Sequence, residues 1–484
     1  MGLLGILLGL GLLIWLSYRG WSVLVLAPAA AVIAALFASE PVLAHWTITF
    51  MGSAAGFVAQ FFPLFLLGAV FGKLMDDSGA VQSIAAFLTD VLGPKRAILA
   101  VVIAGALVTY GGVSLFVAFF VLAPMAQALF RAADIPGRLM PAAIALGTST
   151  FTMSALPGTP AIQNAIPMPV FGTTGFAAPG LGIIASLIML GFGLLWLQRA
   201  EGRARRAGEG FGQRGGDHPA QAADDPVVRE RANTAGTFDP AEMAHSEAGS
   251  ARSGIVVAVL PIAVVVIVNL LVSMVVLPRL DTSYLAEVRF GGITVGSLGG
   301  VWSVIVALCA AIVVQVALTF RNVPALRATV GAGANASVLP VLSVASLVGF
   351  GAVVAAMPAF ISVRDAVLGI GGNPLVSLAV STNLLAALTG SASGGLTIAL
   401  DALGSTYLQI ADANGIDPAL MHRVAVIGAG TLDTLPHNGA VVTLLAVCGC
   451  THRESYFDIV MVAIVGALLA LIAVIGLGTV FGSF

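Results

Sequence analysis

The sequence is poor in charge, and this scarcity limits what kind of protein it can be. Only 9% of its 484 residues are Asp, Glu, Lys or Arg, whereas a soluble domain usually has about a quarter. Hydrophobic residues make up 58%, and the mean hydropathy is +1.03. A water-soluble core cannot bury so much apolar surface, so we expect lipid to be the solvent for most of the chain. The net charge of −2 offers no basic surface for nucleic acid.

Cysteines and catalytic motifs are scarce as well. Cys309, Cys448 and Cys450 lie in apolar stretches without metal-ligand spacing, so we interpret them as core residues and expect no metal and no cofactor. No Gly-x-x-x-x-Gly-Lys-Ser/Thr loop is present, which argues against direct ATP drive. A Gly-x-Ser-x-Gly turn would favour an intramembrane hydrolase, but residues 390–394 have Ala392 at the nucleophile position. We therefore do not expect an enzyme.

Long apolar runs are what the chain has instead. A membrane-spanning helix needs about 20 apolar residues, and residues 1–18 lack the basic start of a signal peptide, so we expect them to form the first span. The predicted fold is an all-α polytopic membrane protein with an inverted repeat, about ten spans, two re-entrant hairpins and two broken helices. The predicted regions are two N-terminal spans (1–52), a first repeat (53–198), a disordered cytoplasmic loop (199–252), linking spans (253–328), a second repeat (329–450) and a C-terminal span (451–484).

Two pairs of apolar segments are short for spans. Residues 97–110 would make about 21 Å of helix at ~1.5 Å per residue, short of the ~30 Å hydrocarbon core. A Gly- and Ser-rich turn joins them to 113–130, and a similar turn joins 374–389 to 395–410. This pattern predicts re-entrant hairpins, which are tolerated at membrane depth only inside protein or against a wet cavity. The alternative is a pair of ordinary short spans.

The distribution of Lys and Arg tests this layout. With both pairs re-entrant and the long loop in the cytoplasm, all but four of the 21 Lys and Arg residues lie inside, as the positive-inside rule requires. The four on the outer side are Arg279, Arg289, Arg364 and Arg423. In this layout the two hairpins enter from opposite sides of the membrane, and no Lys or Arg lies deep in a span.

The two halves of the chain share a pattern. Residues 135–140 resemble 416–421, Gly147 matches Gly428, and 154–160 resemble 433–439. Together with opposite hairpin entry, this predicts an inverted-topology repeat. Such repeats place a substrate site near the membrane midplane between discontinuous helices.

The first break is rich in Pro and hydroxyl groups. Pro157 and Pro160 remove backbone donors, and Gly158 adds freedom, so the helix should open here and expose N–H groups that suit a carboxylate. A simple kink in a packed helix is the alternative. The second break carries Asp433 and His437, which are costly at membrane depth and are therefore candidates for proton coupling; a histidine satisfied by a nearby carbonyl is the alternative. Asp401 is a further acid on the second hairpin, unless it lies near the outer interface.

The hairpin turns and the breaks together supply the candidate site. The predicted substrate-binding residues are Tyr110, Gly111, Gly112, Ser114, Ser149, Thr150, Ser154, Gly158, Thr159, Asn164, Asn383, Ser391, Ser393, Gly394, Thr431 and Asn438. The predicted proton-coupling residues are Asp433 and His437.

Several short motifs resemble the gluconate permease (GntP) family of proton symporters in the ion transporter superfamily. They are Leu66–Met75 followed by Ser78 and Gly79, Arg131–Pro136, Leu156–Pro160, and Asn373 with Pro374. The resemblance implies uptake of gluconate or related hydroxy acids with protons by a homodimer with an elevator-like movement. Gluconate carriers tend to have an acid at Gly111 and a histidine near Gly158, so the chain is more similar to a divergent branch annotated for hydroxybutyrate or other monocarboxylates.

These features predict a secondary active symporter, multi-pass in a bacterial inner (plasma) membrane, that takes up a small organic anion with H⁺. The closest alternative keeps the fold but couples a carboxylate to Na⁺, or exchanges a cation for protons. A passive channel is a third possibility.

Overall fold

Long runs of Leu, Val, Ile and Ala form helices here because a helix satisfies its own backbone hydrogen bonds, which lipid cannot do. The computed structural model describes residues 2–17, 21–113, 115–212, 254–290, 292–320, 323, 325–362, 365, 373–436 and 438–484. Over these ranges the chain consists of helices, turns and loops, without a strand.

Several of the helices are long and apolar enough to cross a membrane. In the described part of the chain, six segments meet this test: Val42–Asp77, Pro179–Arg206, Ile255–Arg279, Val295–Thr319, Leu326–Ala356 and His452–Phe481. Shorter apolar helices cover Gly2–Leu13, Val23–Ala38, Ala118–Ala132 and Pro374–Thr389. The prediction of an all-α polytopic membrane protein is confirmed.

The first half of the chain contains the first hairpin and the first broken helix. Its helices are α1 (Gly2–Ser17), α2 (Val23–Ala38), α3 (Val42–Ala44), α4 (Met51–Asp77), α5 (Ala80–Leu92), α6 (Ala97–Tyr110), α7 (Leu115–Ala132), α8 (Met140–Thr148), α9 (Phe151–Ser154), α10 (Ile162–Ala165), α11 (Pro167–Phe171) and α12 (Pro179–Arg206). A π-helical turn, His45–Phe50, makes α3 continuous with α4. The first predicted broken helix therefore consists of four short helices, α8 to α11.

The second half follows a similar order. Its helices are α14 (Ile255–Leu271), α15 (Val295–Thr319), α16 (Leu326–Ala336), α17 (Val338–Ala356), α19 (Pro374–Thr389), α20 (Ala392–Asn414), α21 (Pro418–Thr431), α22 (Gly439–Val447), α23 (His452–Ile459) and α24 (Gly466–Phe481). A π-helical segment, Val460–Val465, joins α23 to α24. Helices α6 with α7 and α19 with α20 form the two predicted hairpins, and the chain between α21 and α22 is the second break.

The first hairpin's return arm, predicted as 113–130, is Leu115–Ala132, and two boundaries differ more from the predictions. The second hairpin's return arm, predicted as 395–410, is the longer helix Ala392–Asn414, because the Ser391 hydroxyl caps its start by accepting from the Gly394 N–H (3.2 Å) and Gly415 ends it with φ of 63°. The polar loop predicted from residue 199 begins later, because α12 continues to Arg206 with an Arg205–Glu201 ion pair of 2.8 Å. Arg side chains in the last turn also stabilise the helix, because they lie near the negative end of its dipole.

Each broken helix packs closely against the first arm of its own hairpin. A Cβ added to Gly147 of α8 would lie 2.4 Å from the Val102 carbonyl oxygen of α6. A Cβ added to Gly428 of α21 would lie 2.4 Å from the Thr382 hydroxyl of α19. The two glycines that match in the sequence therefore make the same kind of helix contact in the two halves.

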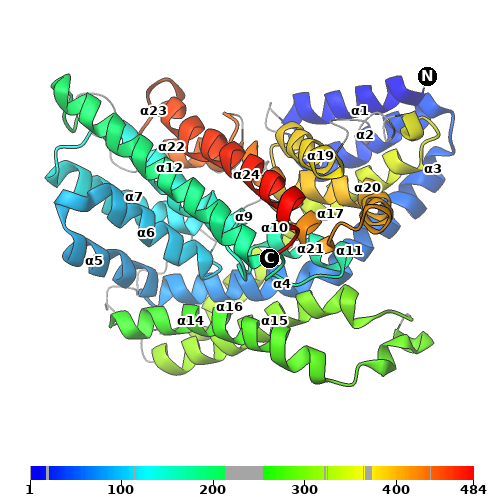
Figure 1. Ribbon diagram of the computed structural model, residues 1–484, viewed down its shortest axis with the longest axis horizontal. Helices are drawn as coiled ribbons and strands as arrows, with labels where there is room; N and C mark the ends of the chain where they lie inside the picture. Colours follow the sequence, from blue (N-terminus) through cyan, green and yellow to red (C-terminus); the bar gives the residue numbers. More distant parts are fainter. Residues whose placement is uncertain are drawn as a thin grey trace.

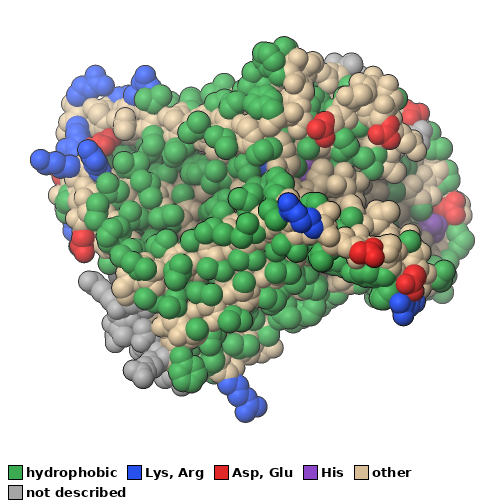
Figure 2. All heavy atoms as spheres, turned by 60° about the horizontal axis from the view of Figure 1, so that its bottom comes forward, with side chains coloured by type: hydrophobic (Ala, Val, Ile, Leu, Met, Phe, Trp, Pro, Cys, Tyr) green, Lys and Arg blue, Asp and Glu red, His purple; other side chains and the backbone are tan. Residues whose placement is uncertain are grey.

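The arrangement of the helices brings distant segments together. Figure 1 shows α12 and α24 side by side across the molecule, with α4, α14 and α15 along its lower side and α5, α6 and α7 at the end opposite α1 and α2. The face that contains α14 and α15 is covered mostly by hydrophobic side chains, and several Lys and Arg side chains gather at one of its ends (Figure 2). A face covered mostly by apolar side chains suits a lipid environment.

Candidate functional site

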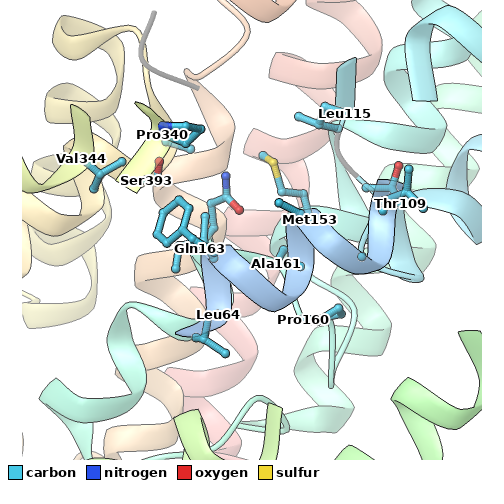
Figure 3. Close-up of a pocket in the computed structure, with 18 of the residues that line it drawn as sticks. Leu64, Thr109, Leu115, Met153, Pro160, Ala161, Gln163, Pro340, Val344 and Ser393 are labelled. Atoms are coloured by element: carbon cyan, nitrogen blue, oxygen red, sulfur yellow. The ribbon is translucent and has the colours of Figure 1, made fainter. Parts of the chain in front are cut away.

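A cavity of about 230 Å³ lies where the two hairpin turns meet the two breaks. The first hairpin contributes Thr109, Gly112, Val113 and Leu115, and the second contributes Ser391, Ala392 and Ser393. The breaks contribute Met153 and residues 160–163 from the first half and Asp433, Asn438 and Ala440 from the second. Helices α4, α16 and α17 complete the wall. In Figure 3, Val344, Pro340 and Ser393 lie on one side and Thr109 and Leu115 on the other, with Met153 and Gln163 between them.

The first hairpin turn is attached to the first break. The Tyr110 hydroxyl donates to the Pro157 carbonyl (2.6 Å), and Gly158 has φ of +78°, a conformation that favours glycine. Asn269, fully buried on α14, donates from its side-chain amide to the Gly158 carbonyl (3.1 Å). These bonds satisfy carbonyls that a continuous helix would have paired internally, so the break is a built feature of the fold.

The second break is attached to the second hairpin turn through Asp433. One Asp433 carboxylate oxygen, Oδ1, accepts from the backbone N–H of Ala392 (2.7 Å) and from the side-chain amide of Asn438 (2.9 Å). The same amide donates to the Gly390 carbonyl (2.8 Å), while the Asn438 Oδ1 accepts from the Ala440 N–H (2.7 Å). The acid therefore lies at the N-terminus of α20, where the helix dipole favours negative charge, and it lines the cavity.

Two adjacent residues of α21 connect the second half to the first break. His422 is fully buried; its Nδ1 lies 2.6 Å from the Thr173 hydroxyl and its Nε2 lies 3.2 Å from the Asn164 side-chain oxygen. Arg423, also fully buried, donates to the Ala177 carbonyl from Nη2 (2.7 Å) and Nε (3.1 Å), and its Nη1 lies 3.5 Å from the Ser154 carbonyl.

Arg423, which charge counting placed on the outer side, is buried inside the protein. Backbone carbonyls freed by the break supply its hydrogen-bond acceptors there. Lys73 is a second buried cation. It is 5% exposed, lines the cavity and pairs with Asp77 at 2.9 Å and with Asp76 at 3.7 Å.

The predicted site residues separate into three groups. Those that line the cavity are Gly112, Ser391, Ser393, Asp433 and Asn438. Those that lie outside the cavity wall, in the hairpins and the broken helices, are Tyr110, Gly111, Ser149, Thr150, Ser154, Gly158, Thr159, Asn164, Asn383, Gly394 and Thr431. Ser114 and His437 lie outside the described residues.

Half of the hydroxyl groups in the second group are paired with backbone carbonyls one helical turn earlier. Thr150, Ser154 and Thr431 each donate to the carbonyl four residues earlier, at 2.7, 3.1 and 2.7 Å. This is the usual way for a hydroxyl to satisfy itself in apolar surroundings. Asp401 is exposed on α20 and is not part of the cavity wall.

Several cavity residues are not among the predicted substrate-binding residues. Thr109, Gln163, Ser337 and Lys73 line the cavity without having been proposed as ligands. Gln163 and Thr109 adjoin the proposed break and turn, so proximity in the sequence could have found them. Ser337 and Lys73 come from helices whose packing the sequence pattern does not specify. Within the described ranges, no three His, Cys, Asp or Glu side chains come together as metal ligands would.

Comparison with known proteins gives matches of three kinds. Residues 1–194 match a sequence profile described as GntP family permease. An uncharacterized transporter of Bacillus subtilis (strain 168), YxjC, is 41% identical over 486 residues and covers 99% of each chain. The solved structure of the Alcanivorax borkumensis YdaH transporter is similar over 91% of this chain and 89% of that chain, with a TM-score of 0.54. At 16% identity this last likeness concerns the fold alone.

Proposed function

This chain belongs to the GntP permease family, and on that premise we propose that it takes up a small organic anion together with a proton. It is a multi-pass membrane transporter and not an enzyme. The proposal adds the mechanism, secondary active symport, and the location, a bacterial inner membrane. The observation that carries it is the cavity walled by both hairpin turns and both breaks, with Asp433 in its wall.

The size and lining of the cavity favour a small hydroxy acid or monocarboxylate, such as hydroxybutyrate or a gluconate-like sugar acid. Its volume of about 230 Å³ is below the ~300–1,000 Å³ of sites that hold drug-sized ligands. The uncharged polar side chains in its wall are hydroxyls and amides: Thr109, Gln163, Ser337, Ser391, Ser393 and Asn438. Hydroxyls and amides can bind both the carboxylate and the hydroxyl groups of such a substrate.

Asp433 supplies a reason for coupling. An anionic substrate and an ionised Asp433 in one small cavity repel each other more strongly than in bulk water, because the protein walls have a lower dielectric constant. Protonation of Asp433 removes this repulsion, so a proton and the anion favour each other's binding. His437 is proposed as a second proton carrier on sequence grounds. The same carboxylate could instead bind Na⁺, which is the alternative form of the proposal.

The inverted repeat is part of the same proposal. Matching hairpins, matching breaks and the matching close contacts of Gly147 and Gly428 support it. Opposite orientation of the two halves would let both breaks converge on one midplane site.

Uptake by proteoliposomes tests the proposed function. We expect the purified protein to accumulate radiolabelled hydroxybutyrate or gluconate when the vesicle interior is more alkaline than the medium, in the absence of Na⁺. Accumulation that follows a Na⁺ gradient alone would replace the proton by Na⁺. Flux without accumulation under either gradient would identify a passive channel and contradict the proposal.

Filling the cavity should stop transport without unfolding the protein. A Cβ added to Gly68, which lines the cavity from α4, meets no heavy atom within 4 Å. Gly68→Leu should therefore place its side chain in the cavity and reduce uptake to background, while Tm in detergent shifts by no more than about 2 °C. Gly56→Leu is the matched control, because Gly56 lies on the same helix, is exposed and also has no atom within 4 Å of an added Cβ. Equal uptake by the two variants would show that the substrate does not occupy this cavity.

A further inference from the structure

The end of α4 holds a buried charged cluster, defined here as Lys73, Asp76 and Asp77, that the proposed proton coupling does not use. All three residues are at most 5% exposed. Lys73 Nζ lies 2.9 Å from Asp77 Oδ1 and 3.7 Å from Asp76 Oδ2. Of the three, only Lys73 is in the wall of the cavity. Lys73 therefore contacts both the cavity and two carboxylates that are not part of the cavity wall.

Lys73 is the only cation in the cavity wall formed by the described residues, where the other charged residue is Asp433. A carboxylate transferred from water into a cavity walled by protein needs a cationic partner or several donors. Lysine suits this role because its ammonium has three donors on a flexible stem, and the stem can reorient it between partners.

Both carboxylates of the cluster have another donor besides Lys73. The Thr329 hydroxyl of α16 donates to Asp77 Oδ2 (2.6 Å), and the Gln82 amide of α5 donates to Asp76 Oδ1 (3.1 Å). Each acid is thus held in place by a helix other than α4. If the ammonium turns toward the cavity, neither carboxylate loses all of its hydrogen bonds, which lowers the cost of the movement.

We propose that Lys73 binds the carboxylate of the transported anion and that Asp77 is its competing partner in the empty cavity. The substrate carboxylate takes the place of Asp77 beside the ammonium. This inference rests on the proposed function, since it names the residue that gives the same cavity its preference for anions.

A purely structural role, in which Lys73 only neutralises Asp76 and Asp77, makes different predictions. Lys73→Met alone leaves two acids beside each other and is expected to destabilise the fold under either interpretation. Lys73→Met combined with Asp77→Asn removes one positive and one negative charge, so the formal charge of the cluster stays the same as in the unmodified protein. Asp77→Asn alone keeps an oxygen that can accept from Thr329 but weakens the competition for Lys73.

The experiment measures KM and maximal uptake rate in proteoliposomes, with whichever of hydroxybutyrate and gluconate the unmodified protein accumulates. The double variant should regain the Tm of the unmodified protein, yet its KM should be higher by about tenfold or more, as expected for loss of a charge-assisted hydrogen bond. Asp77→Asn should lower KM, and Lys73→Arg should preserve most of the affinity. Asp90→Asn, an exposed acid on the neighbouring helix α5, is the control and should change neither quantity.

The outcomes separate the two interpretations. A double variant with the KM of the unmodified protein, or an Asp77→Asn variant with a raised KM, would show that Lys73 is only structural and would overturn the inference. Uptake of neither anion by the unmodified protein would instead contradict the proposed function, and the inference would fail with it.

Discussion

Asp433→Asn should abolish accumulation driven by a pH gradient while leaving exchange of substrate across the membrane intact. The amide that replaces the carboxylate has nearly the same shape, and its oxygen can still accept from the Ala392 N–H and the Asn438 amide, which bind Asp433 Oδ1 at 2.7 and 2.9 Å. The fold of the second hairpin and the second break should therefore survive. What is lost is the ability to gain and release a proton. Without that change of charge, binding of the anion no longer depends on binding of a proton. The protein can then carry the anion only down the anion's own electrochemical gradient.

The measurement compares two assays on the same proteoliposomes. Uptake under an inwardly directed proton gradient should fall to background, whereas counterflow against preloaded substrate should remain within about threefold, less than the loss of one ordinary hydrogen bond would cause. Asp401→Asn serves as the control, because Asp401 is exposed on α20 and lies outside the cavity wall. Normal accumulation by Asp433→Asn would place the coupling proton elsewhere. His437→Ala tests the second proposed carrier in the same way, and normal accumulation in that variant would exclude it.

The hairpins and breaks could be predicted from the sequence because local residues determine them. Helices α6 and α19 begin and end at the predicted residues, 97–110 and 374–389. Pro374 begins α19, and the Asn373 side chain accepts from the Leu375 N–H (2.9 Å) to cap it. The return arm α20 was predicted too short. Because Ser391 caps the helix, the turn residues from Ala392 onward are already helical.

The site was predictable where polar residues interrupt an apolar run, and not elsewhere. Ser391, Ser393, Asp433 and Asn438 stand out by local contrast and do line the cavity. The hydroxyls of Thr150 and Thr431 stand out equally, but helix geometry directs them to the carbonyls of Leu146 and Ile427. Which hydroxyl faces a cavity depends on the rotation of each helix against its neighbours, and an unbroken apolar pattern gives no information on that rotation in a membrane protein.

Arg423→Met should disable transport by loosening the first break. Arg423 belongs to the second half, yet it donates to Ala177, before α12, and reaches the Ser154 carbonyl at the end of α9. The negative end of the α9 dipole also favours a cation at this position, although α9 is short. Methionine has a similar length but no donor. Each buried carbonyl left without a partner costs about 1–3 kcal/mol, partly offset because a buried charge is also removed. We expect Tm in detergent to fall by a few degrees.

The rate of uptake should fall much further than the stability, because the Ser154 carbonyl that Arg423 contacts directly follows the cavity-lining residue Met153. Arg423→Lys separates charge from geometry: an ammonium keeps the charge but cannot reproduce the planar guanidinium that contacts both carbonyls. If geometry matters, Lys and Met variants should both transport poorly, and only the Met variant should change the charge of the buried region. Arg453→Met, exposed on α23, is the control. Wild-type uptake by Arg423→Met would show that the Tyr110 and Asn269 bonds suffice to hold the first break, and that transport does not require the connection that Arg423 makes between the two halves.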